Sequence, residues 1–238
     1  MLFFYIRHGD PVYNPDSLTP LGARQAEALA KRLARYGIDE IYSSTSQRAK
    51  DTAKPTCEML KKEITELDWC NEKYAWEEFT VINDDGKKGW VFCSPEYREL
   101  FCRQEIRDLR NDWCNAPEFA NDNFKNGVVR IRREVDAFFE QLGYCHNQDK
   151  GTYISKMPNE KRIALFAHQG FGMAFLSSVL DIPYPEFALH FDLSHSSMTV
   201  IEFKDVDGIV IPKILTLSND SHIYSENLPT KYNNKIMF

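Results

Sequence analysis

Two histidines follow short apolar runs at opposite ends of the sequence. Residues 2–6 (LFFYI) lead directly into Arg7 and His8, and residues 163–167 (IALFA) lead into His168. A continuous apolar run of this length is typical of a parallel strand that is covered on both faces. Because ligands of open α/β sheets collect at the carboxyl ends of the strands, both imidazoles are expected at that edge.

A second arginine is expected at the same edge. Residues 38–43 read as another strand, and Arg48 falls in the first turn of the helix that follows it. The free backbone N–H groups of a helix N-terminus favour an anion. Gly9 and Gly170, each close behind one of the histidines, leave room for close backbone approach. Two arginines, two histidines and a helix start at one edge predict a phosphate-binding pocket.

Other histidines do not share this pattern. A single histidine after a strand is more often a structural residue than a catalyst, and we favour that interpretation for His146, His190 and His195. A metal site would need carboxylate or cysteine ligands at short spacing, as in H-E-x-x-H, and the sequence has no such motif. We therefore expect neither a metal nor another cofactor.

Five segments, taken in order, carry a resemblance to a known family. They are RHGDPVYN (7–14), LTPLGARQAEALAKRL (18–33), IYSSTSQRAKDTA (41–53), AHQG (167–170) and NDSHI (219–223). Together they resemble the histidine phosphatase superfamily, which is also called phosphoglycerate-mutase-like. The resemblance covers roughly the first third and the final third of the chain.

The resemblance implies a role for each matching residue. His8 would be the nucleophile that forms a phosphohistidine, since a neutral imidazole is available near pH 7. Arg7 and Arg48 would bind the phosphoryl oxygens, because a planar guanidinium donates two parallel hydrogen bonds. His168 would donate to the same group, as a cation, and Asn14 and the backbone N–H of residue 169 would add donors. A backbone carbonyl that accepts the other N–H of His8 would fix the attacking tautomer.

The leaving alkoxide needs a proton, and the family places a glutamate between the second arginine and the insertion. Glu72, Glu77 and Glu78 are the candidates. We favour Glu72, because NEKY (71–74) resembles the NERHYG stretch that carries the acid in phosphoglycerate mutases. Solvated helix positions are expected for the other two. Trp76 lacks the glycines of a Gly-x-Trp-Glu-Gly segment that phosphatases of this family often carry, so the match is incomplete here.

Strands and helices alternate along the chain, which predicts an α/β fold: three α/β/α layers with a mostly parallel central sheet. Strands are expected at 2–6, 38–43, 163–167, 198–203 and 209–217, the last at an edge because it contains Pro212, and helices at 20–36, from 47 with a kink or restart at Pro55, at 128–142 and at 170–180. Residues 10–17 read as a loop. We expect one domain over residues 1–238, with a cap-like insertion at about 79–127 over the carboxyl ends of the strands.

Composition limits the partners. A formal charge of −6 argues against a nucleic-acid binder, and no apolar run is long enough to span or target a membrane. Six dispersed cysteines without a Cys-x-x-Cys spacing are expected to be reduced thiols, which indicates a cytoplasmic protein. The expected partner is a small phosphorylated substrate, and the oligomeric state is open.

These observations favour a metal-independent phosphomonoesterase. A phosphoglycerate-mutase-type phosphoryl transfer and a non-catalytic phosphate-binding protein on the same fold are the alternatives. The identity of the substrate is open. Four aromatic residues in and before the expected insertion, Trp69, Tyr74, Trp76 and Trp90, either line a substrate pocket or pack at the base of the insertion, and packing is the interpretation we favour.

Overall fold

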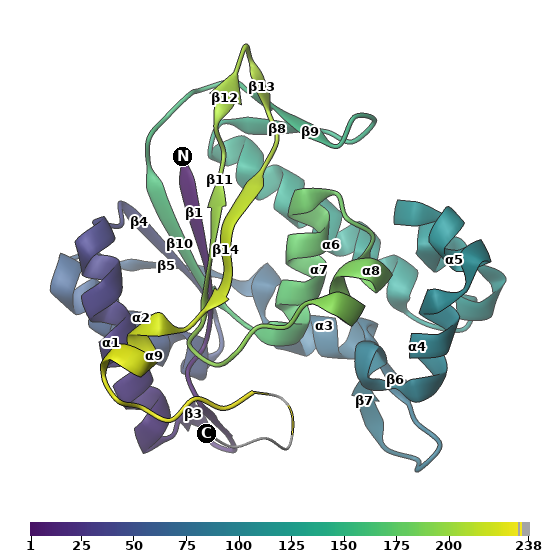
Figure 1. Ribbon diagram of the computed structural model, residues 1–238, viewed down its shortest axis with the longest axis horizontal. Coiled ribbons are helices and arrows are strands. Elements are labelled where there is room, and N and C mark those ends of the chain that lie inside the picture. Colours follow the sequence, from purple (N-terminus) through teal and green to yellow (C-terminus); the bar gives the residue numbers. More distant parts are fainter. Residues whose placement is uncertain (233, 235–238) are drawn as a thin grey trace.

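A six-stranded sheet forms the centre of the protein, which is described from a computed structural model covering residues 1–232 and 234 (Figure 1). Its strand order is β14-β11-β1-β10-β4-β5. The strands are β1 (Leu2–Arg7), β4 (Glu40–Ser44), β5 (Ile64–Leu67), β10 (Arg162–Ala167), β11 (Met198–Glu202) and β14 (Lys213–Asn219). The four neighbouring strands β1, β10, β4 and β5 are parallel to one another. Strand β11 runs antiparallel to both of its neighbours, β1 and β14. The predicted α/β fold with a mostly parallel sheet is confirmed.

Helices cover both faces of this sheet. On one side lie α1 (Pro20–Tyr36), α2 (Gln47–Leu60) and the short α9 (Ser221–Ser225), and on the other lie α6 (Phe124–Gln141) and α7 (Gln169–Leu180), as Figure 1 shows. Strand β1 sends alternate side chains to the two cores. Phe4 and Ile6 pack with Leu29 and Leu33 of α1, while Phe3 and Tyr5 pack with the α6 and α7 residues. This burial on both faces explains why β1 is an unbroken apolar run.

The caps of α1 match its sequence. Thr19 accepts a hydrogen bond from the backbone N–H of Gly22, Pro20 occupies the first turn, and Gly37 ends the helix with a φ of 71°. Helix α2 continues through Pro55, so the predicted restart is absent and the alternative, a kink there, stays a prediction. Proline removes one backbone hydrogen bond there, and the packing of the buried Ala53 and Cys57 outweighs that loss.

Two other segments differ from their predicted form. The expected loop at 10–17 contains a small hairpin of β2 (Pro11–Tyr13) and β3 (Asp16–Leu18). The strand expected at 209–217 is divided at Pro212, where β13 (Ile209–Val210) ends before β14 begins. Strand β13 belongs to a second, four-stranded sheet with β12 (Asp205–Val206), β9 (Thr152–Ser155) and β8 (Tyr144–Asn147), at the top of Figure 1.

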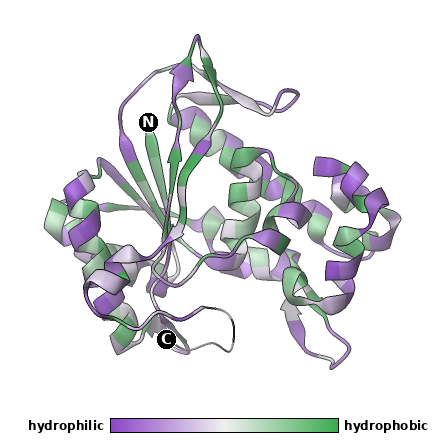
Figure 2. Cartoon of the chain, in the orientation of Figure 1, coloured by the Kyte–Doolittle hydropathy of each residue, from purple (hydrophilic) through white to green (hydrophobic). Residues whose placement is uncertain are grey.

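Residues 68–127 lie beside α7 and extend away from the sheet (Figure 1). Their elements are η1 (Asp68–Cys70), α3 (Glu72–Glu78), the hairpin β6 (Thr80–Ile82) and β7 (Lys88–Trp90), η2 (Val91–Cys93), α4 (Pro95–Cys102), α5 (Gln104–Asp108), η3 (Arg110–Asn115) and η4 (Pro117–Phe119). Their buried apolar residues belong to the same core cluster as those of α6 and α7, and Figure 2 shows apolar and polar residues mixed along these elements. The cap-like role of residues 79–127 stays a prediction.

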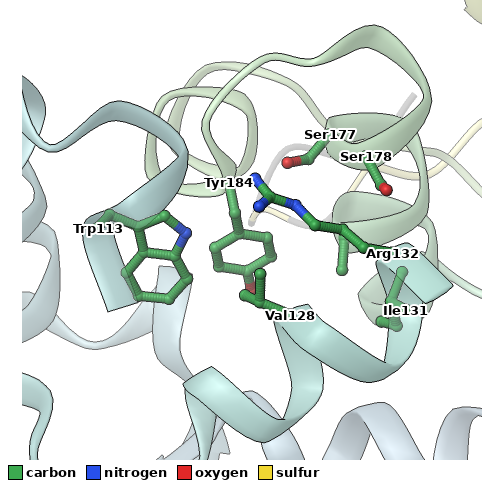
Figure 3. A pocket seen from close by; sticks show the side chains of 8 residues that line it. Trp113, Val128, Ile131, Arg132, Ser177, Ser178 and Tyr184 are labelled. Atoms are coloured by element: carbon green, nitrogen blue, oxygen red, sulfur yellow. The ribbon is translucent and has the colours of Figure 1, made fainter. Parts of the chain in front are cut away.

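A small internal cavity marks the junction of this region with α6, α7 and α8 (Tyr184–His190) (Figure 3). Trp113, Arg132 and Tyr184 are among its lining residues, and Arg132 reaches into it from α6. At about 20 Å³ it has room for about one water molecule. It is too small for a phosphate ester, so the site must lie elsewhere.

All six cysteines are free thiols. Within the described residues, no helix is both long enough and apolar enough to cross a bilayer.

Two glycines, Gly9 after β1 and Gly22 in α1, allow two backbone segments to approach closely. The substitution Gly22→Ala tests this contact. A Cβ at Gly22 would lie 2.2 Å from the carbonyl oxygen of Asp10, and one at Gly9 would lie 2.8 Å from the carbonyl oxygen of Gly22. Alanine inside a helix normally stabilises by about 1 kcal/mol relative to glycine. Here we expect the opposite sign, a loss of about 2 kcal/mol in the free energy of unfolding, because backbone atoms must move.

Urea unfolding of Gly22→Ala beside Ala23→Ser, an exposed position on the same helix, measures this effect. The control should change by no more than about 0.5 kcal/mol. A Gly22→Ala protein as stable as the wild type would contradict the close backbone approach.

Candidate active site

The pairing of β1 with β10 brings the two histidines together. Arg7 is in register with Ala167, so His8 and His168 leave adjacent parallel strands at the same level. Their ring centroids are 5.3 Å apart, and both side chains are buried. The backbone N–H of His8 donates to the carbonyl of Ala167 at 3.0 Å, which continues the pairing past the strand ends. The predicted meeting of residues from opposite ends of the chain is present.

A backbone carbonyl sets the tautomer of His8. Its Nδ1 lies 2.7 Å from the carbonyl oxygen of Gly9, which can only accept, so Nδ1 carries the proton and Nε2 keeps its lone pair. Burial, followed by the nearby His168 and the two arginines, holds the pKa of His8 well below its ordinary value. The imidazole is therefore neutral near pH 7, which is the state a nucleophile needs.

His168 is held from three sides. Its Nδ1 is 3.2 Å from Nη2 of Arg48, which can only donate, so Nδ1 is an acceptor and Nε2 donates to Oγ of Ser44 at 2.8 Å. The hydroxyl of Tyr5 donates to the carbonyl of His168 at 2.6 Å. Burial and the two arginines keep the pKa of His168 well below normal, so among protein groups alone the ring is neutral rather than the expected cation.

The two arginines enter from different elements. Arg7, at the end of β1, donates to the carbonyl of Leu193 and lies 2.6 Å from Nε2 of His195. Arg48, in the first turn of α2, donates to Asp16 at 2.8 Å and to Glu72 at 3.3 Å. The Nε atoms of both guanidiniums are buried and have no hydrogen-bond partner within residues 1–232 and 234. Such donors fit an anion.

Glu72 is the glutamate that reaches this cluster. One carboxylate oxygen accepts from the backbone N–H of Gly170 at 2.8 Å, and the other lies 3.4 Å from Nδ1 of His168. Since that nitrogen is an acceptor, a proton on Glu72 satisfies both atoms. Burial raises the pKa of Glu72 despite the two arginines and the backbone donors, so its neutral acid form extends to higher pH.

The other two glutamates lie elsewhere. Glu78 is buried in a bidentate pair with Arg130, at 2.6 and 2.7 Å, where it ties α3 to α6. Glu77 is exposed and lies on the wall of a second, larger cavity, which is also lined by Arg48 and Glu72. The expected solvated position is thus found for Glu77 and not for Glu78, whose arginine partner lies more than fifty residues away in the sequence.

Asn14 is not brought to the cluster. It is exposed in the turn between β2 and β3, and the interactions found among the described residues do not connect it to His8 or the arginines. Its role as a phosphate ligand stays a prediction. Asp16, at the start of β3, holds Arg48 instead.

His195 is the site residue that the sequence analysis missed. Its ring centroid is 5.7 Å from that of His8, its Nε2 accepts from Arg7, and its Nδ1 is 3.6 Å from a carboxylate oxygen of Asp10. Asp10 is itself fixed by Thr19 at 2.7 Å. The signal in the sequence was weak, because His195 precedes β11 and only the pairing of β11 with β1 brings it beside Arg7.

The cluster also has the outline of a metal site. Ligand atoms of His8, Glu72 and His168 all lie within 4.8 Å of one another. Two guanidiniums adjoin the same atoms, however, and Arg48 donates to Glu72 and His168 directly. A cation there would face two fixed positive charges, whereas a phosphate dianion would be attracted by them.

Comparison with known proteins agrees with this geometry. Residues 3–83 match the sequence profile of the histidine phosphatase superfamily (branch 1). The resemblance to this superfamily that the sequence motifs indicated is thus confirmed over these residues. A phosphatase, that is a phosphoric monoester hydrolase, is the enzyme class that this match and the names of the relatives support.

One curated relative and two solved structures illustrate the similarity. The putative phosphoserine phosphatase 2 of Hydrogenobacter thermophilus is 24% identical over 155 residues, which is 61% of this chain and 68% of the relative. A phosphoserine phosphatase from Entamoeba histolytica, solved with 3-phosphoglyceric acid, aligns with a TM-score of 0.58 at 16% identity over 93% of this chain and 98% of its own. A mycobacterial glucosyl-3-phosphoglycerate phosphatase aligns with a TM-score of 0.57 at 19% identity, over 91% of this chain and 98% of its own. At these identities the solved structures show a shared fold.

Buried neutral histidines predict that acid destabilises this protein. The pKa values of His8 and His168 are well below normal, burial and Arg7 lower that of His195 to about 3, and burial and Arg32 lower that of His222 to about 4. Below about pH 6.5 the unfolded chain binds protons that the native state refuses, so stability falls as the pH falls. The raised pKa of Glu72 opposes this trend, because at this group the native state binds up to one proton more than the unfolded chain.

We expect the free energy of unfolding to drop by about 2 kcal/mol or more between pH 7 and pH 5, since each such histidine contributes up to about 1.4 kcal/mol per pH unit. Urea unfolding across this range measures the slope. His222→Gln should reduce the slope, whereas His190→Gln, at an exposed histidine, should leave it unchanged. A flat profile would mean that these imidazoles accept protons in the native state.

Proposed function

We propose that this protein is a metal-independent phosphomonoesterase that forms a phosphohistidine on His8 and acts on a small phosphorylated metabolite. The proposal rests above all on the fixed tautomer of His8, whose free Nε2 belongs to a ring packed against His168 and flanked by two arginines. The family match and the phosphatase names of its relatives support the same class. We further propose a cytoplasmic location, with no nucleic acid, membrane or metal cofactor as partner.

In the first step the guanidiniums of Arg7 and Arg48 hold the phosphoryl oxygens. Nε2 of His8 attacks phosphorus, the P–N bond forms and the bond to the ester oxygen breaks. Glu72 gives its proton to the departing alkoxide. Since phosphoryl transfer demands mainly positioning and charge stabilisation, this arrangement supplies most of the catalysis. A dianion beside His168 offsets the two arginines and favours its protonated form, which then donates to the phosphoryl group.

In the second step water attacks the phosphohistidine. Glu72, now a carboxylate, takes a proton from that water, the P–N bond breaks, and inorganic phosphate leaves. The enzyme returns with neutral His8 and protonated Glu72. Both steps therefore use one acid–base group in its two states.

A mutase would need a second anion site for the other phosphate of its substrate. The cationic residues on the wall of the adjoining cavity are Arg48 and Lys73, and Asp16, Glu72 and Glu77 share that wall. Arg103, between α4 and α5, and Arg107, in α5, are exposed and do not line it. This balance of charge favours a hydrolase.

The nucleophile is tested with His8→Asn. We expect turnover of p-nitrophenyl phosphate to fall at least a thousandfold, because no P–N bond can form, and wild-type turnover to persist in EDTA. Acid quenching with a radiolabelled ester should trap label on the wild type and none on the variant. The exposed His190→Asn serves as the control. Activity that disappears with EDTA, or that survives in His8→Asn, would contradict the proposal.

The acid is tested with Glu72→Gln. We expect kcat for an alkyl phosphate to fall by about 10²- to 10⁴-fold. The fall should be much smaller for p-nitrophenyl phosphate, whose leaving group needs little protonation. In the wild type, alkyl ester turnover should decline as the pH rises through the raised pKa of Glu72, and the variant should lose this alkaline limb.

Glu58→Gln, at an exposed position on α2, provides the control for Glu72→Gln. Equal losses for both esters would show that Glu72 has a structural role and is not the proton donor.

A further inference from the structure

We propose that the cavity beside Arg48 and Glu72 binds the alcohol part of the substrate, and that it selects phosphate esters whose alcohol carries a ring with an apolar face. This inference rests on the proposed function and names its substrate class. The ring would stack on Trp76 and Trp90, and an aromatic ring and a sugar ring both offer such a face.

The cavity begins where the phosphoryl chemistry ends. It has a volume of about 770 Å³, within the range of small-molecule sites, and both Arg48 and Glu72 are on its wall. Glu72 gives its proton to the ester oxygen, so the group attached to that oxygen must lie beside Glu72. The cavity is therefore placed to hold the leaving alcohol.

Two tryptophans form an aromatic wall. Trp76 comes from α3 and Trp90 from β7, and they meet edge to face with centroids 5.1 Å apart at 89°. Trp90 is held from behind, because it stacks on Phe92 at 5.8 Å and 10°. It also covers Gly170, where a Cβ would lie 2.2 Å from the indole. A rigid indole face loses little entropy when a ligand stacks on it.

Aromatic residues near the cavity differ in whether they pack in the core or face the cavity. Trp69 packs against Phe138 and Phe171 in the core, as the sequence analysis favoured. Trp76, in contrast, is 38% exposed, and Tyr13 of β2 adds a third ring to the cavity with 68% of its surface exposed. Exposed aromatic area beside a catalytic cluster is surface that a ligand can cover favourably.

The charges at the rim favour an uncharged ring over a second anion. Lys73 is the cation on the wall besides Arg48, and it is already 3.5 Å from Asp68 and 4.5 Å above the ring of Tyr74. Glu77 and Asp16 lie on the same wall. A carboxylate or second phosphate would meet repulsion there, whereas sugar hydroxyls would find acceptors.

Benzyl phosphate and ethyl phosphate test the inference, because both release alcohols of similar acidity and differ by the ring. We expect kcat/KM to be at least about tenfold higher for benzyl phosphate, with glucose 6-phosphate distinguishing a sugar ring from an aromatic one. Trp76→Ala and Trp90→Ala should each remove most of this preference, measured as the ratio of kcat/KM for benzyl phosphate to that for ethyl phosphate. Trp76→Phe should retain part of it. Tyr224→Ala, at a residue 84% exposed on α9, is the control.

Binding to His8→Asn separates this inference from the proposed function. Isothermal titration should show tighter binding of benzyl phosphate or glucose 6-phosphate than of ethyl phosphate in this variant, independent of turnover. Equal rates and equal affinities for the three esters would overturn the ring pocket and leave the phosphatase intact. Ring-dependent binding with no turnover of any ester by the wild type would support the pocket and overturn the proposed function.

Discussion

Two imidazoles and two guanidiniums share one buried region, and the rest of the structure serves to hold them there. Burial and the positive charges of Arg7 and Arg48 lower the pKa of both histidines and keep them neutral. The fixed charge of Arg48 is balanced in part by Asp16. A phosphate dianion complements this arrangement better than any protein group, since it accepts from both guanidiniums and favours a proton on His168. We therefore expect the cluster to prefer an anion, because burying two guanidinium charges without one costs free energy.

Each member of the cluster is oriented by a neighbour that does no chemistry. The carbonyl of Gly9 fixes His8, and the backbone N–H of Gly9 in turn donates to Oγ of Thr52 at 3.0 Å. Ser44 fixes His168, and His195 with Asp10 lies behind Arg7. These supports come from α2, β4 and the segment before β11. The site therefore depends on the complete sheet and its helices.

The sequence predicted the parts of the fold that local pattern determines. Apolar runs indicated β1 and β10, and the caps of α1 indicated its ends, because burial on both faces and capping act over a few residues. Pro55 was expected to kink or restart α2; it does not end the helix, whose buried residues pack on the core both before and after it.

Tertiary proximity was harder to predict than local structure. The strand expected to end at 217 was divided between two sheets, because pairing partners far along the chain decide where a short strand belongs. For the site, the order of the motifs identified His8, Arg48, Glu72 and His168, whose side chains the structure brings together. The role of His195 was missed, and for Trp76 and Trp90 a pocket-lining role was considered but packing was favoured. Each depends on a contact between segments whose spacing in the sequence carries no period.

The hairpin of β6 and β7 connects the proposed ring pocket to the proposed proton donor. Trp90 covers Gly170, and the backbone N–H of Gly170 donates to Glu72. Burial is the first cause of the raised pKa of Glu72. In our proposal, a ring stacked on Trp90 would add to this burial. Residues 3–83, which match the family profile, include His8, Arg48, Glu72 and Trp76, whereas His168 and Trp90 lie beyond them. A Cβ at residue 170 would collide with Trp90, so this contact requires glycine there. A change in the hairpin that alters the proposed choice of alcohol must therefore leave Gly170 in place.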